Sequence, residues 1–203
     1  MVNTSNLLFL HHSFVRRLQT FLTEHHERRA THNMNLPHKN VSFLGIGGRT
    51  VSKKLSFDLD KIKAIQPKII ILELGTNDLC VVGQHPESVG SDIEHLVQVL
   101  HDYCGAEFIM VRLVIYRSAI PPHVPDFSHK VDLLNKYLKV VLEPLPYTEA
   151  WSHRGLQSPS IAFFILRWHS FKRSGRLCSL SQLRADFMSY YLRQISNLES
   201  LVL

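Results

Sequence analysis

The chain has few of the features that mark secreted or membrane-spanning proteins. Its 203 residues include only 3 cysteines, and no apolar run approaches the roughly 20 residues that a membrane helix needs. Cys80, Cys104 and Cys178 are an odd, widely spaced set, which argues against a disulfide framework and fits a reducing compartment. The first apolar run is only Leu7 to Leu10, with no basic segment before it, so no signal peptide is recognisable. We therefore expect a cytoplasmic protein without a membrane span.

Motifs for metals and nucleic acids are also lacking. The net charge is +6, but the basic residues are scattered as pairs such as Arg16-Arg17 and Lys172-Arg173, without interleaved aromatic residues. Such pairs are typical of solvated helix faces. The adjacent histidines of His11-His12 and His25-His26 would not face each other on a helix, so their spacing is wrong for chelating a metal. We expect no metal, no cofactor and no nucleic-acid partner.

What the chain does have is an alternation of apolar, strand-like runs with helical patterns. A composition of 45% hydrophobic residues in a chain of this length suits one core, so we expect a single domain over residues 1–203. Strands separated by helices imply a mostly parallel, five-stranded sheet of the α/β class with right-handed crossovers. The expected strands are 7–10, 41–44, 68–74, 106–115 and, more weakly, 146–151; the expected helices are 14–22, 86–103 and 128–142.

A polar loop, Gly75-Thr76-Asn77-Asp78, follows the buried strand expected at 68–74. The carboxyl ends of parallel strands are where α/β sheets place ligand-binding loops. Gly75 permits a sharp turn, and Asn77 offers a neutral amide donor that could face a developing negative charge. The alternative is an Asx-type turn, in which these polar side chains only close the strand and cap the next helix.

Two further loops follow the first two expected strands. Ser13 comes after the run 7–10, where its hydroxyl would lie above the sheet edge and near a helix N-terminus that favours negative charge. The alternative for Ser13 is an ordinary N-cap serine. The second loop, Gly45-Ile46-Gly47-Gly48-Arg49-Thr50, has enough glycine to bring its backbone amides close to a ligand.

Together, in this order and spacing, the loops resemble the SGNH/GDSL hydrolase family, whose members are serine esterases and lipases. The resemblance runs from about Asn6 onward and is most specific over residues 43–78. Ser13 matches the family's nucleophile, whereas Gly48 and Asn77 match its oxyanion-hole residues. The resemblance implies a three-layer α/β/α sandwich with a flavodoxin-like sheet. It also implies hydrolysis of a small acyl or acetyl ester, with substrate pockets in variable loops, here 81–86 and 117–127.

The resemblance further implies a histidine base held by an aspartate, and here the chain departs from the pattern. The best counterpart of the family's Asp-x-x-His is Leu166-Arg167-Trp168-His169, so His169 aligns with the base but leucine replaces the aspartate. Losing that carboxylate in a triad can cost about ten-thousandfold in rate. His11-His12 also replaces the family's Gly-Asp before the serine. His12 is a further candidate base, although neighbouring side chains on a turn usually diverge.

From about residue 158 onward the local signals match the family poorly. Codons permitted for Leu166 to Phe171, such as CTG-CGA-TGG-CAT-TCA-TTT, give Cys-Asp-Gly-Ile-His when they are read from the next nucleotide. That peptide is the missing family block, which leads to the hypothesis that this part of the chain is translated out of frame, as in a decaying gene copy.

Three functions remain open from the sequence. The first is a serine esterase impaired by its altered triad, and the second is an inactive relative that keeps the cleft as a binding module. The third is a retroelement-associated protein, because similar esterase domains occur in some retroelement-encoded proteins. Neither the substrate nor the oligomeric state can be derived from these residues.

Overall fold

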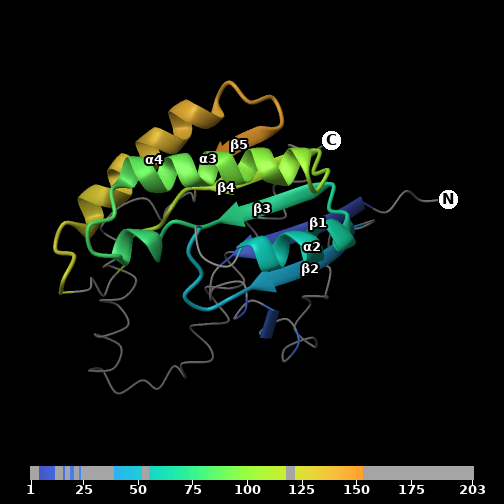
Figure 1. Ribbon diagram of the computed structural model, residues 1–203, viewed down its shortest axis with the longest axis horizontal. Helices are drawn as coiled ribbons and strands as arrows, with labels where there is room; N and C mark the ends of the chain where they lie inside the picture. Colours follow the sequence, from blue (N-terminus) through green and yellow to red (C-terminus); the bar gives the residue numbers. More distant parts are fainter. Residues whose placement is uncertain are drawn as a thin grey trace, which may run out of the picture.

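The computed structural model describes residues 5–11, 39–51, 55–117 and 122–152, together with the single residues 16, 19, 20 and 23. These residues form a five-stranded parallel sheet with the order β2-β1-β3-β4-β5 (Figure 1). Its strands are β1 (Ser5–His11), β2 (Lys39–Gly45), β3 (Ile69–Glu73), β4 (Phe108–Arg112) and β5 (Thr148–Trp151). The expected α/β class, the five strands and their parallel pairing are therefore confirmed.

Three described helices follow the strands and lie over one face of the sheet: α2 (Leu55–Ile65), α3 (Pro86–Asp102) and α4 (Phe127–Leu142) (Figure 1). Alternate strand residues such as Leu8, Leu10 and Leu72 point into this layer, as the two-residue period of a strand requires. They pack there in one apolar core with the inward residues of the helices. Helices α3 and α4 begin and end within one residue of the sequence expectation, whereas α2 was not expected.

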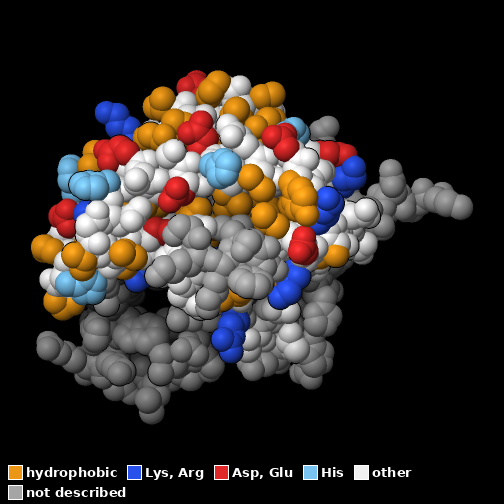
Figure 2. Space-filling model, in the orientation of Figure 1, with side chains coloured by type: hydrophobic (Ala, Val, Ile, Leu, Met, Phe, Trp, Pro, Cys, Tyr) orange, Lys and Arg blue, Asp and Glu red, His pale blue; other side chains and the backbone are white. Residues whose placement is uncertain are grey.

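Helices α3 and α4 pack closely against each other. Gly90 of α3 faces the ring of Tyr137 on α4, and a Cβ atom at position 90 would lie 2.3 Å from the Cδ1 atom of that ring. The apolar side of α3 is buried, whereas Glu87, Ser91 and Asp92 are exposed. Helix α3 is therefore amphipathic, with its apolar stripe turned to the sheet and to α4. On the surface of the molecule, acidic, basic and apolar side chains are interspersed over the face seen in Figure 2.

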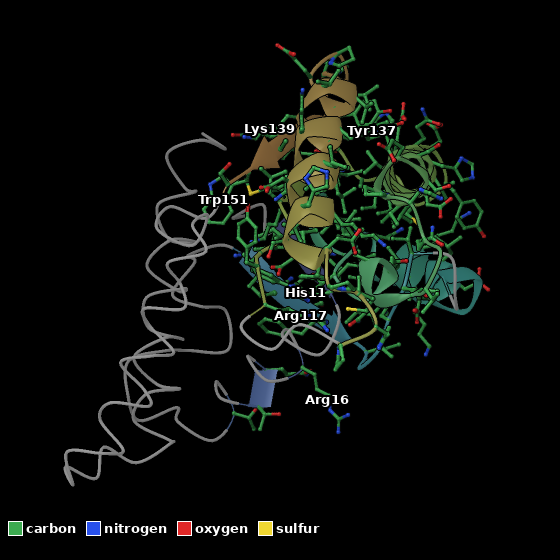
Figure 3. All side chains as sticks on the ribbon, turned by 90° about the vertical axis from the view of Figure 1, so that its left-hand side faces the viewer. His11, Arg16, Arg117, Tyr137, Lys139 and Trp151 are labelled. Atoms are coloured by element: carbon green, nitrogen blue, oxygen red, sulfur yellow. The ribbon has the colours of Figure 1, made fainter. Side chains whose placement is uncertain are left out.

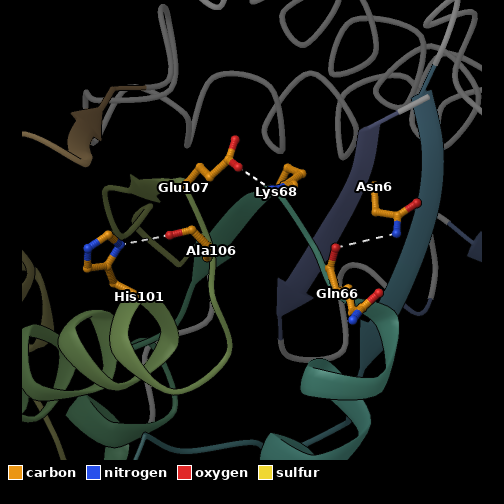
Figure 4. A network of polar contacts seen from close by, with 6 residues as sticks. All are labelled: Asn6, Gln66, Lys68, His101, Ala106 and Glu107. Carbon is orange, nitrogen blue, oxygen red and sulfur yellow. Dashed lines mark hydrogen bonds and ion pairs between the residues drawn. The ribbon is translucent and has the colours of Figure 1, made fainter. Parts of the chain in front are cut away.

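At the amino ends of the strands, polar contacts fix the turns that lead into the sheet (Figure 4). The Nδ2 atom of Asn6 on β1 donates to the carbonyl oxygen of Ile65, 2.8 Å away, which ties the end of α2 to the sheet. The contacts drawn in Figure 4 are Asn6 with Gln66 (3.4 Å), Lys68 with Glu107, and His101 with Ala106 (2.8 Å). This end of the sheet lies opposite the loops that the sequence analysis singled out.

Several expectations fall outside the described residues. Of the helix expected at 14–22, only residues 16, 19 and 20 are described, and all three are helical. Residues 153–203, which include the altered family block, are not described. In the part of the chain that is described, no helix combines the length and apolar character needed to cross a membrane.

Candidate functional site

The last residues of the five strands form a single row across the carboxyl edge of the sheet. In the order of the strands, the row is Gly45, His11, Glu73, Arg112 and Trp151. Figure 3 looks onto this edge and labels His11, Arg117 and Trp151 there. In a flavodoxin-like strand order, the chain reverses its direction of winding beside β1, and ligands bind at the carboxyl ends of the strands at that point. The fold therefore places the loops after β1, β2 and β3 together at the usual ligand-binding edge.

The glycine-rich loop after β2 is fastened to the end of β1. The amide of Ile46 donates to the carbonyl oxygen of His11 at 3.2 Å, and the amide of Arg49 closes a turn onto the carbonyl oxygen of Ile46 at 3.3 Å. Gly48 adopts a φ of +69°, a region that favours glycine, and no atom lies within 4 Å of the place where its Cβ would stand. The turn therefore presents Gly48 in an exposed, open position beside the strand that leads to Ser13.

A buried ion pair anchors the same loop to helix α2. The Nη2 atom of Arg49 lies 2.7 Å from the Oδ2 atom of Asp58 in the first turn of α2, and both side chains are buried. Burial lowers the pKa of Arg49, and the attraction of Asp58 opposes that shift. Separating the two side chains would leave both charges buried without a partner, which is costly. The ion pair therefore holds the glycine-rich loop against α2.

The loop after β3 reaches across to the glycine-rich loop through its side chains. The Nδ2 atom of Asn77 donates to the carbonyl oxygen of Arg49 at 2.8 Å, and the Oδ1 atom of Asp78 accepts from the amide of Val51 at 2.8 Å. Asn77 precedes the short 3₁₀ helix η1 (Asp78–Cys80), but its side chain makes no capping bond there. The Asx-turn alternative is therefore wrong for Asn77, whose amide group binds the carbonyl oxygen of Arg49, the residue after Gly48.

Gly75 and Asp78 show how this loop is built. Gly75 has a φ of +102°, and a Cβ there would meet the side chains of Leu134 at 3.0 Å and Val114 at 3.2 Å, so glycine is needed for both conformation and space. Burial raises the pKa of Asp78, and backbone hydrogen bonds, including that from Val51, lower it in part. The loop thus carries a buried carboxyl group whose charged form is disfavoured by its surroundings.

A buried ionic network runs across the strand ends. The Nε2 atom of His11 lies 2.6 Å from the Oε2 atom of Glu73, and the Nη1 atom of Arg112 lies 3.0 Å from the same oxygen. The guanidinium of Arg112 also lies over the ring of Trp151, 5.1 Å from its centroid. Burial lowers the pKa of Arg112 to about 10, against the attraction of Glu73. Buried polar and charged side chains therefore link three neighbouring strands directly below the candidate loops.

The sequence analysis missed Glu73 and Arg112, although a signal for both was present. Each is a lone charged residue in an apolar run, and each ends its strand. Two isolated charges of opposite sign at equivalent positions of neighbouring strands indicate a buried pair, because an unpaired charge would be costly there. His11 was interpreted only as a bulky replacement for the family's glycine, whereas its imidazole is part of this network.

The structure brings together two of the four site residues expected from the sequence. Asn77 binds the carbonyl oxygen of Arg49, the residue that follows Gly48 in the glycine-rich loop. Ser13 and His169 lie outside the described residues, as do His12 and Leu166. Ser13 comes two residues after His11.

Comparison with known proteins places the chain in a family. The sequence profile of the GDSL-like lipase/acylhydrolase family matches residues 5–179. The chain belongs to this family. The match covers all of the described strands and both loops that carry Gly48 and Asn77. The resemblance found in the loop motifs is therefore confirmed, together with the assignment to an acylhydrolase family.

Solved structures of esterases share the fold of this GDSL-family chain. The psychrotrophic esterase EstA from Pseudoalteromonas sp., solved in a form inhibited by monoethylphosphonate, is 14% identical, with 97% of this chain and 99% of that chain covered and a TM-score of 0.61. A GDSL-like lipase from Bacteroides thetaiotaomicron is 10% identical over 86% and 91% of the two chains, with a TM-score of 0.56. The acetyl xylan esterase AlAXEase is 12% identical over 81% and 84%, with a TM-score of 0.55. No functionally curated protein sequence matches the chain.

Proposed function

We propose that this GDSL-family chain is a serine esterase that hydrolyses a small acyl or acetyl ester. The observation that carries the proposal is the 2.8 Å hydrogen bond from the Asn77 side chain to the carbonyl oxygen of Arg49. It joins the loops after β2 and β3, so that the Asn77 amide and the Gly48 turn stand at the same edge of the sheet. Ser13 follows β1, which lies between those two strands.

In the proposed reaction, the Ser13 hydroxyl attacks the ester carbonyl carbon while a base accepts the hydroxyl proton. The resulting tetrahedral intermediate carries an oxyanion, to which the amides of Ser13 and Gly48 and the Nδ2 group of Asn77 would donate. The alcohol then leaves with a proton returned by the base, and water hydrolyses the acyl-serine in a second, equivalent step. Donors fixed before the reaction are effective because they need no reorganisation as the charge develops.

His169 is the proposed base, and the leucine at position 166 limits what it can do. A neutral imidazole without a carboxylate partner has no fixed tautomer and no counter-charge once it is protonated. We therefore propose an esterase with slow turnover, in which acylation of Ser13 still occurs. The same leucine favours a second candidate function, a catalytically inactive relative that binds an ester or its products in the retained cleft.

A fluorophosphonate probe distinguishes the two candidates, because it forms a stable adduct with an activated serine. For the esterase, the full chain is labelled, Ser13→Ala abolishes the labelling, and Asn77→Ala slows it by about a hundredfold to a thousandfold. Ser91→Ala is the matched control, because it removes an exposed hydroxyl from α3, outside the loops that carry Gly48 and Asn77. A correctly folded chain that takes up no label would exclude the esterase and leave the binding module.

The acyl preference is tested with p-nitrophenyl esters. We expect p-nitrophenyl acetate to be hydrolysed faster than the octanoate ester, with Ser13→Ala removing both activities. His169→Ala should reduce acetate hydrolysis strongly if that residue is the base, because serine attack depends on removal of the hydroxyl proton. An unchanged rate in that variant would transfer the role of the base to another group.

A further inference from the structure

Arg117 makes an unusual set of contacts at this edge of the sheet. Its Nη2 atom donates to the Oδ1 atom of Asn77 at 2.7 Å, and its Nη1 atom lies 3.3 Å from the Sγ atom of Cys80. The guanidinium also lies over the ring of Phe127, 6.0 Å from the centroid. In the described ranges no carboxylate forms an ion pair with Arg117. The half-buried guanidinium of Arg117 thus makes its strongest hydrogen bond to the side-chain amide of Asn77, a proposed oxyanion donor.

The two ends of the Asn77 amide are held by partners of opposite kind. A guanidinium can only donate hydrogen bonds and a carbonyl oxygen can only accept them. Arg117 therefore requires the oxygen of the amide, and the carbonyl group of Arg49 requires its nitrogen. If the Asn77 amide were rotated by 180°, its NH₂ group would face the guanidinium of Arg117 and its oxygen would face the carbonyl oxygen of Arg49. Neither pair can form a hydrogen bond. Arg117 consequently determines which atom of the Asn77 amide faces the carbonyl oxygen of Arg49.

The bond from Arg117 also changes how strongly Asn77 donates. Hydrogen bonds from a charged donor are about twice as strong as neutral ones, and hydrogen bonds in a chain polarise one another. Donation to the oxygen of an amide draws electron density away from its nitrogen. The Nδ2 hydrogens of Asn77 therefore become stronger donors toward an oxyanion. In addition, only the Asn77 amide group would separate the positive charge of Arg117 from the negative charge of that oxyanion.

The backbone that carries Arg117 is braced against α4. The side-chain amide of Asn135 binds the backbone of Val114 at both ends, accepting from its amide at 2.8 Å and donating to its carbonyl oxygen at 2.9 Å. The Tyr116 hydroxyl bonds the carboxylate of Asp132, also on α4. Arg117 thus extends from a fixed segment, which favours a defined geometry over a loosely held surface charge.

We propose that Arg117 is a positioning residue for the ester hydrolysis proposed above, acting through Asn77 by fixing and polarising its amide. The inference rests on that proposed function. It adds a role for the loop after β4, which the sequence analysis treated only as a source of substrate pockets. It requires Arg117 and Asn77 to act as one unit, so that Arg117 has nothing to contribute once the Asn77 amide is absent.

A double-mutant cycle tests this dependence. Arg117→Met keeps much of the side-chain stem, and we expect it to lower kcat for p-nitrophenyl acetate by about tenfold to a hundredfold with KM within about twofold. In the Asn77→Ala background the same change should cost less than about twofold. Arg117→Lys, which can still donate to the amide oxygen, should retain more activity than Arg117→Met.

Lys130→Met is the matched control for charge. The Nζ atom of Lys130 donates to the carbonyl oxygen of Gln84 at 3.3 Å, in the loop 81–86. The change therefore removes a cation near that loop without altering a contact of Asn77. We expect its rate to stay within about twofold of the unsubstituted chain. In ¹⁵N–¹H spectra, the side-chain amide signal of Asn77 should move in Arg117→Met and stay in place in Lys130→Met.

The outcomes separate this inference from the proposed function. Ser13-dependent activity that is unchanged in Arg117→Met, or multiplicative losses in the double variant, would overturn the inference and leave the esterase standing. A raised KM with kcat unchanged would also overturn it, because Arg117 would then bind substrate and not position Asn77. A chain without Ser13-dependent activity or labelling overturns the esterase and this inference with it.

Discussion

His11 and Glu73 face each other at the ends of adjacent strands, with 2.6 Å between the Nε2 atom of the histidine and the Oε2 atom of the glutamate. Arg112 approaches the same carboxylate oxygen from the next strand. The strand ends below the candidate loops are thus held by a buried network of polar and charged side chains as well as by the backbone ladder. Such a network is sensitive to the loss of one member, because the remaining charges stay in a low-dielectric environment.

We expect Arg112→Met to lower the free energy of unfolding by about 3–5 kcal/mol, because it leaves the Glu73 charge buried without its cation. Urea unfolding measures the loss. The double variant Glu73→Leu with Arg112→Met should lose less than the single variant, since it no longer holds a buried carboxylate without its guanidinium partner. Lys68→Met is the control, because its ion pair with Glu107 is exposed and worth about 1 kcal/mol or less. A double variant less stable than Arg112→Met would contradict the buried-charge argument.

Gly47 and Gly48 provide a matched pair for the backbone of the glycine-rich loop. At both positions the space that a Cβ would occupy has no atom within 4 Å, but only Gly48 has a φ in the left-handed region, at +69°. We expect Gly48→Ala to cost about 1–2 kcal/mol of unfolding free energy and Gly47→Ala about 0.5 kcal/mol or less. Thermal unfolding of both variants checks this. Equal costs would show that conformation at position 48 is not the constraint.

Asp78 gives a pH-dependent prediction. Burial raises its pKa, so the folded state holds the proton more tightly than the unfolded state does. The stability that this proton supplies is fully present below the ordinary pKa of an aspartate, about 4, and is lost as pH rises through the raised value. The unfolding free energy of Asp78→Asn should therefore improve relative to the unsubstituted chain between pH 4 and pH 7.

Urea titrations at several pH values measure that difference. The Oδ1 atom of an asparagine can still accept the hydrogen bond from the amide of Val51, so the contact between the loops is retained. Asp102→Asn makes the same change in charge on an exposed side chain at the end of α3. A pH-independent difference between Asp78→Asn and the unsubstituted chain would argue against the raised pKa.

The contact between α3 and α4 predicts that Gly90→Ala is destabilising, contrary to the usual benefit of alanine in a helix. The new Cβ would stand 2.3 Å from the ring of Tyr137, and the overpacking should cost about 1–3 kcal/mol. Tyr137→Leu in the same chain should recover part of that cost by removing the ring. Ser91→Ala, at the next and exposed position of α3, should be neutral or slightly stabilising. Thermal unfolding distinguishes these outcomes.

The hypothesis of a shifted reading frame is tested on the gene. If it holds, genomic DNA or a transcript across the codons of Leu166 to Phe171 will spell Asp-Gly-Ile-His or Asp-Gly-Val-His in the shifted frame. A chain carrying that restored block should show faster Ser13-dependent hydrolysis, because the histidine regains its carboxylate partner. Codons that spell neither peptide would end this hypothesis and leave His169 as the proposed base.

Most of the sheet could be predicted from the sequence, because buried parallel strands are continuous apolar runs such as 68–74. The loops that carry Gly48 and Asn77 could be located because each directly follows a strand-like apolar run, whereas the oxyanion-hole roles of the two residues stay predictions. The pairing of His11, Glu73 and Arg112 could not be read from local patterns, since it depends on the register of strands that are distant in sequence. Asn77 shows the same limit: its tetrapeptide was equally compatible with a local turn, and only the position of Arg49 excluded that turn.

The shared register of the strand ends also restricts where residues can be inserted into this chain or deleted from it. One residue inserted within β1 would turn His11 toward the helical layer, where Leu10 now packs, and would place an imidazole in an apolar core. The same holds for Glu73 in β3. Insertions and deletions are therefore confined to the connections outside the strands. The loops of the proposed substrate pocket can diversify there without disturbing His11, Glu73 and Arg112 at the strand ends.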